Sequence, residues 1–252
     1  MQDVHEVKKK LYQISAITDR GQRLNPFVSP MYQEKLKEME QLVNDLEKQN
    51  SEISEEKLSG EWELIYSTVE LFRSSPFFLA IEKALNDKYK SNLFFKLHQL
   101  QVGSFGLSTI GRIAQNIDFE KKEFISTFDT IIFGLTTIPI LGWFKLLPTF
   151  GGRVITLADE LNLNDNILQM NLRKTKVSKV EGLNKIPIFS KLLMDRWYPV
   201  KEVWEKLPWN KEIPSCEVSV IYLDEEIRIM KDLYGSIFIY VRPTISLLNT
   251  NV

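Results

Sequence analysis

The residues best suited to chemistry form one acidic cluster near the end of the chain, Asp224, Glu225 and Glu226, followed by Arg228. Paired carboxylates beside an arginine can carry out acid–base catalysis. The local pattern favours a structural role, because alternating apolar segments flank the cluster on both sides. Asp224 and Glu225 are then predicted in a tight turn between two antiparallel strands, where carboxylates cap backbone amides. Arg228 is predicted to share a strand face with Glu226, either as an ion pair or as a contact to a ligand.

Other catalytic or metal-binding combinations are not evident in the sequence. The two histidines, His5 and His98, fall in separate predicted elements, so neither a zinc cluster nor a nucleophilic triad has its parts. A glycine-containing segment around Phe105 lacks the lysine of a nucleotide-binding loop and is predicted to be a hairpin loop. The single cysteine, Cys216, excludes an internal disulfide and suits a reducing compartment. We therefore expect a protein that is not an enzyme and holds neither metal nor cofactor.

Two apolar segments, 131–152 and 182–214, place aromatic residues beside cations. The first is predicted to be an irregular loop, since its prolines and glycines disfavour a regular strand. Aromatic rings beside a lysine are typical of a membrane interface, and they also suit a protein partner or a lid over a barrel mouth. All three interpretations stay open for both segments. The residues expected to make such contacts are Trp143, Phe144, Lys145, Leu146, Trp197, Trp204 and Trp209.

Composition sets further bounds on the class of protein. With 252 residues and 44% apolar content, the chain can bury one substantial core and an accessory layer. A formal net charge of −1 offers no field to attract a nucleic-acid backbone, so no nucleic-acid partner is expected. The longest apolar stretch, 131–147, is interrupted and shorter than the roughly 20 residues of a spanning helix. The N-terminus has no signal or transit pattern, which predicts a bacterial chain or one whose transit peptide has been removed.

Hydrophobic periodicity predicts helices first and strands afterwards. Two amphipathic helices precede residue 58, and a third begins near Ser75 and Pro76. Trp62, Leu64 and Tyr66 alternate along a strand and are predicted to face one interior. About nine short strands follow in total, including one at 97–102. They favour a mainly β, lipocalin-like barrel of about eight or nine antiparallel strands, since closure removes exposed edges and leaves room for one small ligand.

This pattern divides the chain into three parts. Residues 1–57 form a helical segment that packs on the barrel. Residues 58–246 form the barrel itself, with 182–214 as an aromatic and basic connecting segment. Residues 247–252 form a tail. The Trp62 strand is expected to pair with the strand at 236–242 and so to close the barrel.

Two sequence motifs resemble the fibrillin family, the plastid lipid-associated proteins or plastoglobulins. The first is Tyr222-Leu223-Asp224-Glu225-Glu226-Ile227-Arg228-Ile229, followed by a glycine and an apolar strand that ends at Arg242. The second is Leu58-Ser59-Gly60-Glu61-Trp62-Glu63-Leu64-Ile65-Tyr66-Ser67, which is similar to the opening strand of the family. A weaker match is Thr18-Asp19-Arg20-Gly21. The chain departs from the family pattern at Lys231-Asp232, where many members have arginine and glycine.

The resemblance implies a non-enzymatic protein that binds or sequesters a small hydrophobic molecule. The implied cargo is a prenylquinone, carotenoid, tocopherol, fatty acid or polar lipid, and the implied place is the peripheral surface of thylakoid membranes or plastoglobule-like lipid bodies, in a plastid or a cyanobacterium. Trp62, Tyr66 and Phe105 are expected to line the ligand site, with Arg228 as its polar anchor. An alternative is an assembly protein with a side-chain-filled barrel, which binds a prenyl-chain biosynthetic enzyme or a photosynthetic complex. A bilin-lyase-like enzyme is a third, less favoured interpretation.

Overall fold

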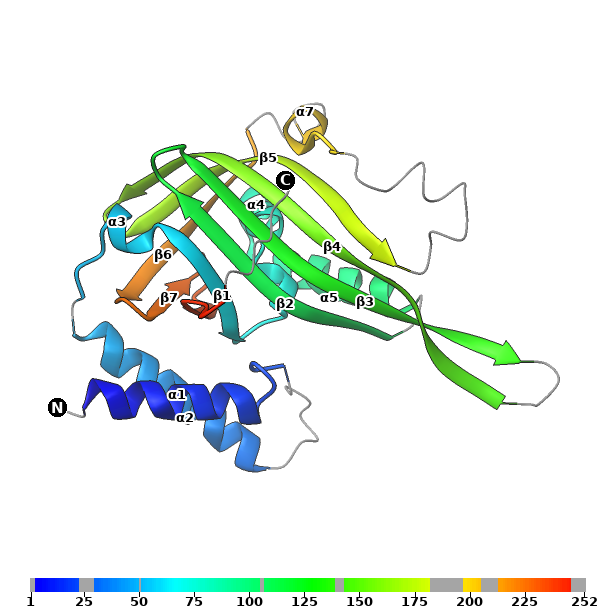
Figure 1. The fold of residues 1–252 in the computed structure, drawn as a ribbon, viewed down its shortest axis with the longest axis horizontal. Coiled ribbons are helices and arrows are strands. Elements are labelled where there is room, and N and C mark those ends of the chain that lie inside the picture. Colours follow the sequence, from blue (N-terminus) through cyan, green and yellow to red (C-terminus); the bar gives the residue numbers. More distant parts are fainter. Residues whose placement is uncertain are drawn as a thin grey trace.

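The computed structural model describes residues 3–22, 30–49, 51–104, 107–138, 143–181, 197–204 and 213–245. Eight antiparallel strands follow one another in chain order and close into a ring through the pairing of β1 with β8 (Figure 1). The strands are β1 (Gly60–Ser67), β2 (Leu107–Asp118), β3 (Glu123–Ile138), β4 (Trp143–Asn164), β5 (Ile167–Glu181), β6 (Ser215–Leu223), β7 (Ile227–Lys231) and β8 (Ile237–Val241). The predictions of a mainly antiparallel sheet and of closure between the first and last strands are confirmed.

Helices lie outside the ring and at its ends. They are α1 (Val4–Ile17), α2 (Pro30–Glu47), α3 (Glu55–Leu58), the 3-10 helix η1 (Leu71–Ser74), α4 (Pro76–Leu85), α5 (Lys88–Ser104) and α7 (Val200–Trp204). Apolar residues of α1 and α2 pack against outward-facing residues of β7, including Ile227 and Ile229. The alternate residues Arg228 and Met230 point to the other side of the same strand and are buried inside the ring. Strand periodicity thus separates an outer core under the helices from an inner core.

A bulge in β1 changes the face on which Tyr66 lies. Leu64 pairs with Tyr240 and Tyr66 with Ile239, so one residue of β1 is left over between them. Trp62 and Leu64 pack in the inner core, whereas Tyr66 packs with α1 and α2 on the outside. The prediction that all three share one face is therefore wrong for Tyr66, because a bulge shifts the alternation by one residue.

The predicted strand at 97–102 is part of helix α5. Ser91 and Phe95 are buried at helical spacing, and Phe95 packs with Phe72 and Phe78. Leu93 and Leu97 are exposed, so the apolar residues of this segment do not follow the buried face. Because several apolar residues of this segment lie on the exposed face of the helix, its hydrophobic pattern did not indicate a helix.

Residues 131–138 and 143–152 extend two paired strands, so the prediction of an irregular loop is wrong there, and residues 139–142 lie outside the described residues. Backbone pairs continue from Gly134 opposite Leu147 to Ile138 opposite Trp143. Pro148 is accommodated at a register shift, where Ile132 pairs with Phe150 and Phe133 with Pro148. Because β2 pairs with β3 only up to Phe133, this part projects beyond the ring as a two-stranded ribbon, 134–138 with 143–147 (Figure 1).

Candidate functional site inside the ring

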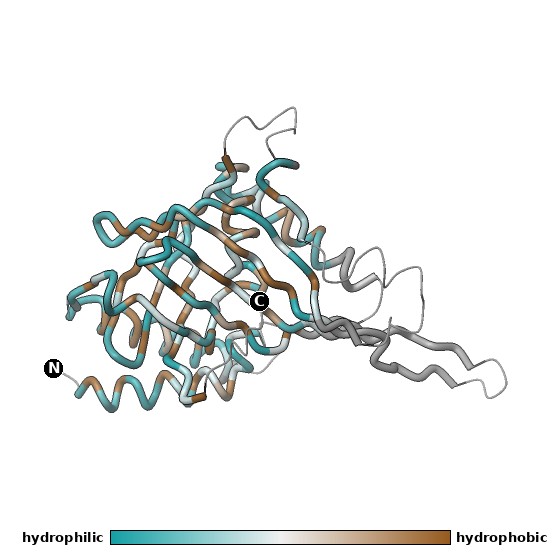
Figure 2. Tube along the Cα trace, turned by 45° about the horizontal axis from the view of Figure 1, so that its top comes forward, coloured by the Kyte–Doolittle hydropathy of each residue, from teal (hydrophilic) through white to brown (hydrophobic). Residues whose placement is uncertain are grey.

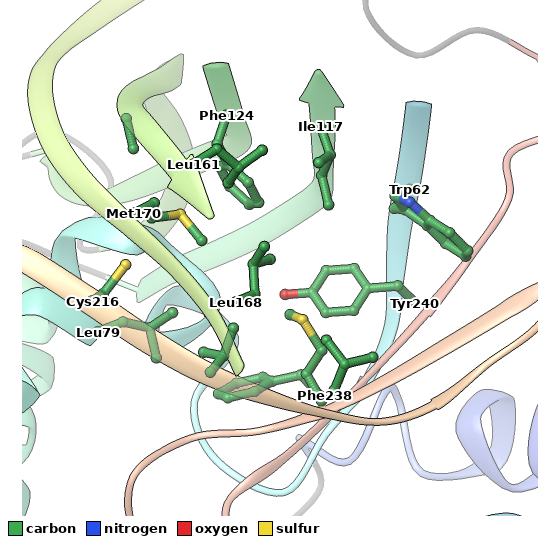
Figure 3. Packing of buried hydrophobic residues seen from close by; sticks show 14 of the residues in the cluster. Trp62, Leu79, Ile117, Phe124, Leu161, Leu168, Met170, Cys216, Phe238 and Tyr240 are labelled. Atoms are coloured by element: carbon green, nitrogen blue, oxygen red, sulfur yellow. The ribbon is translucent and has the colours of Figure 1, made fainter. Parts of the chain in front are cut away.

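The interior of the ring is lined by apolar side chains from every strand. Hydrophobic and hydrophilic residues alternate along much of the described strands (Figure 2), as expected for a sheet with one buried face. Tyr240 extends into the interior towards Leu168, with Trp62, Ile117 and Phe238 around it (Figure 3). From α4, Leu79 and Ala80 join the same cluster, so this helix contributes to the filling of the interior.

Arg228 places a charged side chain in this apolar interior. Its side chain is 0% exposed, and its guanidinium lies 4.3 Å from the ring centre of Tyr240 and 5.0 Å from that of Trp62. Its Nη2 donates a hydrogen bond to Gln115 Oε1 at 2.5 Å. Its Nε and Nη1 have no hydrogen-bond partner among the described residues. A fully buried arginine normally has its donors satisfied and its charge paired, so Arg228 is a candidate ligand contact.

The charge of Arg228 is not balanced by a described carboxylate. Burial lowers its pKa to about 9, and the nearby cation Arg242 adds to this effect while Tyr240 opposes it. Arg242 itself stacks on Trp62 at 3.9 Å and donates from Nη1 to the Ser59 carbonyl at 2.7 Å. At neutral pH Arg228 is still protonated, since its pKa stays above that range. The interior therefore holds a positive charge in low-dielectric surroundings.

Gln115 holds the guanidinium of Arg228 in one orientation. Its Nε2 donates to the hydroxyl of Tyr240 at 2.9 Å and to the Ser74 carbonyl at 3.2 Å. These two contacts fix which end of the amide is the acceptor, so Oε1 is directed to Arg228. The role of Gln115 was not predicted from the sequence, because its partners come from η1, β7 and β8.

A second buried polar group joins α4 to the β7–β8 turn. Arg73 Nη2 lies 2.8 Å from Glu82 Oε2 and 3.8 Å from Asp232 Oδ2, with all three side chains at most 6% exposed. Burial, and then the negative charge of Asp232, raises the pKa of Glu82 to about 7. Arg73 also stacks on the ring of Phe95 at 4.2 Å. This group was not predicted, and its members belong to three separate segments.

The acidic turn lies outside the ring and binds α1. Asp224 Oδ1 accepts hydrogen bonds from the backbone amides of Glu226 and Ile227, and Lys8 Nζ lies 2.7 Å from both Asp224 Oδ2 and Glu226 Oε2. The ion pair predicted between Glu226 and Arg228 is wrong. Glu226 belongs to the turn and is exposed, whereas the first residues of β7 carry Arg228 inward. Glu225 is exposed at the same turn.

The remaining predicted contact residues do not gather at one place. Trp62 lies in the interior, where its Nε1 donates to the Leu58 carbonyl at 2.8 Å. Trp197 lies on the outer face of β5, with Lys174 and Lys176 Nζ 4.4 and 4.6 Å from its ring centre. It borders a groove of about 510 Å³ with a mainly polar lining.

Trp204 of α7 packs against the inner core, and Phe105 and Trp209 lie outside the described residues. For Trp143, Phe144, Lys145 and Leu146 the structure gives the backbone of β4.

Catalytic and metal chemistry have little support in the described part of the chain. Within those ranges, no three His, Cys, Asp or Glu side chains are grouped so as to hold a metal ion. Burial raises the pKa of the Cys216 thiol to about 12, so it stays protonated and is a poor nucleophile. None of the helices found in the same ranges combines the length and the apolar character needed to span a bilayer.

The described part of the chain thus belongs to the class of mainly antiparallel β proteins, with eight strands closed into a ring around an apolar interior that holds the buried cation Arg228. The family model PAP_fibrillin matches residues 5–241, and the chain therefore belongs to this family of plastid lipid-associated proteins. The resemblance seen in the two end motifs is thereby confirmed. No curated protein and no solved structure shows a significant match to the chain.

Proposed function

We propose that this protein is a non-enzymatic carrier or sequestering protein that holds a small hydrophobic molecule inside a lipocalin-like barrel. The observation that carries the proposal is the closed ring of eight strands with inward-facing apolar side chains. Such an interior shields a ligand from water at about 25 cal/mol per Å² of apolar surface buried, without covalent chemistry. The candidate cargo classes are prenylquinones, carotenoids, fatty acids and polar lipids, at thylakoid membranes or plastoglobule-like lipid bodies.

Cargo that co-purifies with the protein tests this proposal directly. The full chain is purified from its native host without detergent and extracted with organic solvent, and the extract is analysed by mass spectrometry. One lipid class at near-stoichiometric amounts is the expected result. The delipidated protein should then show a higher melting temperature when that lipid is returned, because a ligand that binds the folded state stabilises it. Absence of any bound lipid, together with no thermal shift for these cargo classes, would overturn the proposal.

Two features support contact with a lipid surface. The ribbon of 134–138 and 143–147 projects from the ring and carries an apolar sequence with Trp143 and Phe144. On α5, Tyr89, Leu93 and Leu97 are exposed at spacings of four residues, 77%, 46% and 56% respectively. Helix α5 ends at Ser104, close in the chain to the start of β2, and β2 pairs with β3 at the base of the ribbon. Both features thus belong to one end of the ring, and we infer peripheral attachment there.

A second candidate function is that of an assembly protein, and one observation favours it. Leu79 and Ala80 of α4 pack within the inner core, so side chains of the protein itself occupy part of the interior. In that case the protein partner would be a prenyl-lipid biosynthetic enzyme or a photosynthetic complex, bound at the outer surfaces. The two candidates are separated by native mass spectrometry of the purified chain. A lipid-loaded species supports the carrier, whereas a lipid-free chain in a stable complex with one such enzyme supports the assembly protein.

A further inference from the structure

The unpaired guanidinium of Arg228 restricts the chemical class of the ligand. Arg228 has no exposed surface, and its Nε and Nη1 donors have no partner among the described residues. A buried charge without a partner is strongly unfavourable, and buried donors without acceptors are unfavourable as well. Its described surroundings supply one neutral acceptor, Gln115 Oε1, and two aromatic rings. An anion that accepts hydrogen bonds from the free donors would remove both costs.

Four acidic residues on elements near Arg228 are paired with other cations. Asp224 and Glu226 face outward and bind Lys8. Glu82 and Asp232 are grouped around a different arginine, Arg73. The other cation near Arg228, Arg242, donates to backbone carbonyls and increases the local positive charge. Among the described residues no carboxylate is thus paired with Arg228, and a bound anion would supply the missing counter-charge.

We propose that the ring binds a single-chain amphipath with a carboxylate head group, seated on Nε or Nη1 of Arg228, and an apolar tail along the inner core. This assignment rests on the proposed function and narrows it from hydrophobic molecules in general to acidic lipids such as long-chain fatty acids. A carboxylate suits the site because it brings a full negative charge and two acceptor oxygens in a small volume. Leu168, Met230 and Phe238 provide the apolar surroundings that a hydrocarbon tail requires.

Gln115 acts as a positioning residue in this site. Since its Nε2 is bonded to Tyr240 and Ser74, its Oε1 occupies one edge of the guanidinium, and the opposite donors are left for the ligand. Changing this amide to a carboxylate places a negative charge beside Arg228 without changing the size of the side chain. Such a variant should satisfy the charge of Arg228 internally and compete with an acidic ligand.

A comparison of matched acidic and neutral probes tests the proposal. Delipidated full-length protein is titrated calorimetrically with palmitic acid and with 1-hexadecanol, which has the same chain length and no charge. The wild type should bind palmitate at least tenfold more tightly than the alcohol. Arg228→Met and Gln115→Glu should each weaken palmitate binding at least tenfold and leave hexadecanol binding within about threefold. Arg112→Met, which removes an exposed arginine from β2, should keep the wild-type preference.

Stability measurements keep the result interpretable. Arg228→Met removes an unpaired buried charge and replaces it with an apolar side chain, so the ligand-free variant should melt at or above the temperature of the wild type. Equal binding of palmitate and hexadecanol by the wild type overturns the acidic-ligand assignment and leaves the proposed function intact. Equal loss of both probes in Gln115→Glu also overturns it, since the effect would then be structural. Failure of the wild type to bind either probe or any lipid of the named classes counts against the proposed function itself.

Discussion

Glu82 and Asp232 approach the same nitrogen of one buried arginine, Arg73 Nη2, at 2.8 and 3.8 Å. Two carboxylates thus share one nitrogen of this cation at the contact between α4 and the β7–β8 turn, and Glu70 Oε2 lies 3.6 Å from its Nη1. Burial and the charge of Asp232 raise the pKa of Glu82 from 4.5 to about 7. The folded protein therefore holds the Glu82 proton more tightly than the unfolded chain does. By linkage, the contribution of this residue is fully present below pH 4.5, decreases as the pH rises from 4.5 to about 7, and is constant above that.

The first prediction is that Glu82→Gln removes this pH dependence. A shift of this size corresponds to on the order of 3 kcal/mol across the interval, since one pKa unit is about 1.4 kcal/mol. The free energy of unfolding is measured with urea at several pH values from 4 to 8, and the wild type minus Glu82→Gln difference is plotted. We expect that difference to fall with rising pH. Glu123→Gln, at the first residue of β3, serves as control. If the free energy of unfolding of the wild type minus that of Glu82→Gln stays constant or rises between pH 5 and 7, the prediction is wrong.

The second prediction concerns Trp62, which is 0% exposed and bonded to the Leu58 carbonyl. Trp62→Ala should lower the free energy of unfolding by about 3 to 5 kcal/mol, because it leaves a large cavity beside Arg228 and Arg242. Trp197→Ala, on the outer face of β5, should cost much less and provides the matched control. Urea unfolding followed by circular dichroism gives both values. If the two variants lost equal stability, the interior position of Trp62 would not be supported.

The third prediction concerns the turn between β6 and β7. Asp224 accepts from two backbone amides and from the Tyr222 hydroxyl at 2.6 Å, and it is ion-paired with Lys8. Asp224→Ala should therefore lower the free energy of unfolding by about 1 to 3 kcal/mol, since several polar partners lose their acceptor. Glu225→Ala, at the exposed neighbouring position, should change it by less than about 0.5 kcal/mol. Urea unfolding measures the loss in free energy of unfolding for both variants. An equal loss in Glu225→Ala and Asp224→Ala would contradict the prediction.

Sequence patterns predicted those parts of the fold that depend on local alternation. The strand that contains Val218 alternates regularly between buried and partly buried residues, so its position followed from period two. Tyr66 was assigned to the wrong face because a single bulge residue reverses the alternation, and a bulge leaves no clear sign in one sequence. The helical segment at Leu97 was missed because its exposed leucines do not mark its buried face.

The candidate site was only half predictable for a different reason. Arg228 could be predicted as a candidate ligand contact, because a cation on an apolar strand is unusual. Gln115 is 113 residues away in the chain, and the contact between the two exists only because β2 and β7 lie across the interior from one another. The group of Arg73, Glu82 and Asp232 has the same property. Polar contacts across a closed ring depend on its register, which local patterns do not contain.

The last prediction concerns the projecting ribbon, whose backbone pairs run from Gly134 with Leu147 to Ile138 with Trp143 and to which no other described strand is paired. A triple variant with Trp143→Ser, Phe144→Ser and Lys145→Glu should shift the protein from vesicles to the soluble fraction in liposome flotation. Each inserted aromatic contributes on the order of 1 to 3 kcal/mol, and each lysine near an anionic surface adds about 1 kcal/mol that decreases with salt.

The vesicles for this experiment contain galactolipid with an anionic lipid, and binding is followed from low to high salt. Lys121→Glu is the charge-reversal control, because Lys121 lies at the β2–β3 turn, at the end of these strands opposite to the ribbon. A double variant of α5, Leu93→Ser with Leu97→Ser, tests the neighbouring exposed face. Its loss of vesicle binding should add to the loss seen in the triple variant. If the triple variant floats as well as the wild type while the α5 variant does not, the helix rather than the ribbon makes the membrane contact. If both float unchanged, this end of the ring binds something other than lipid.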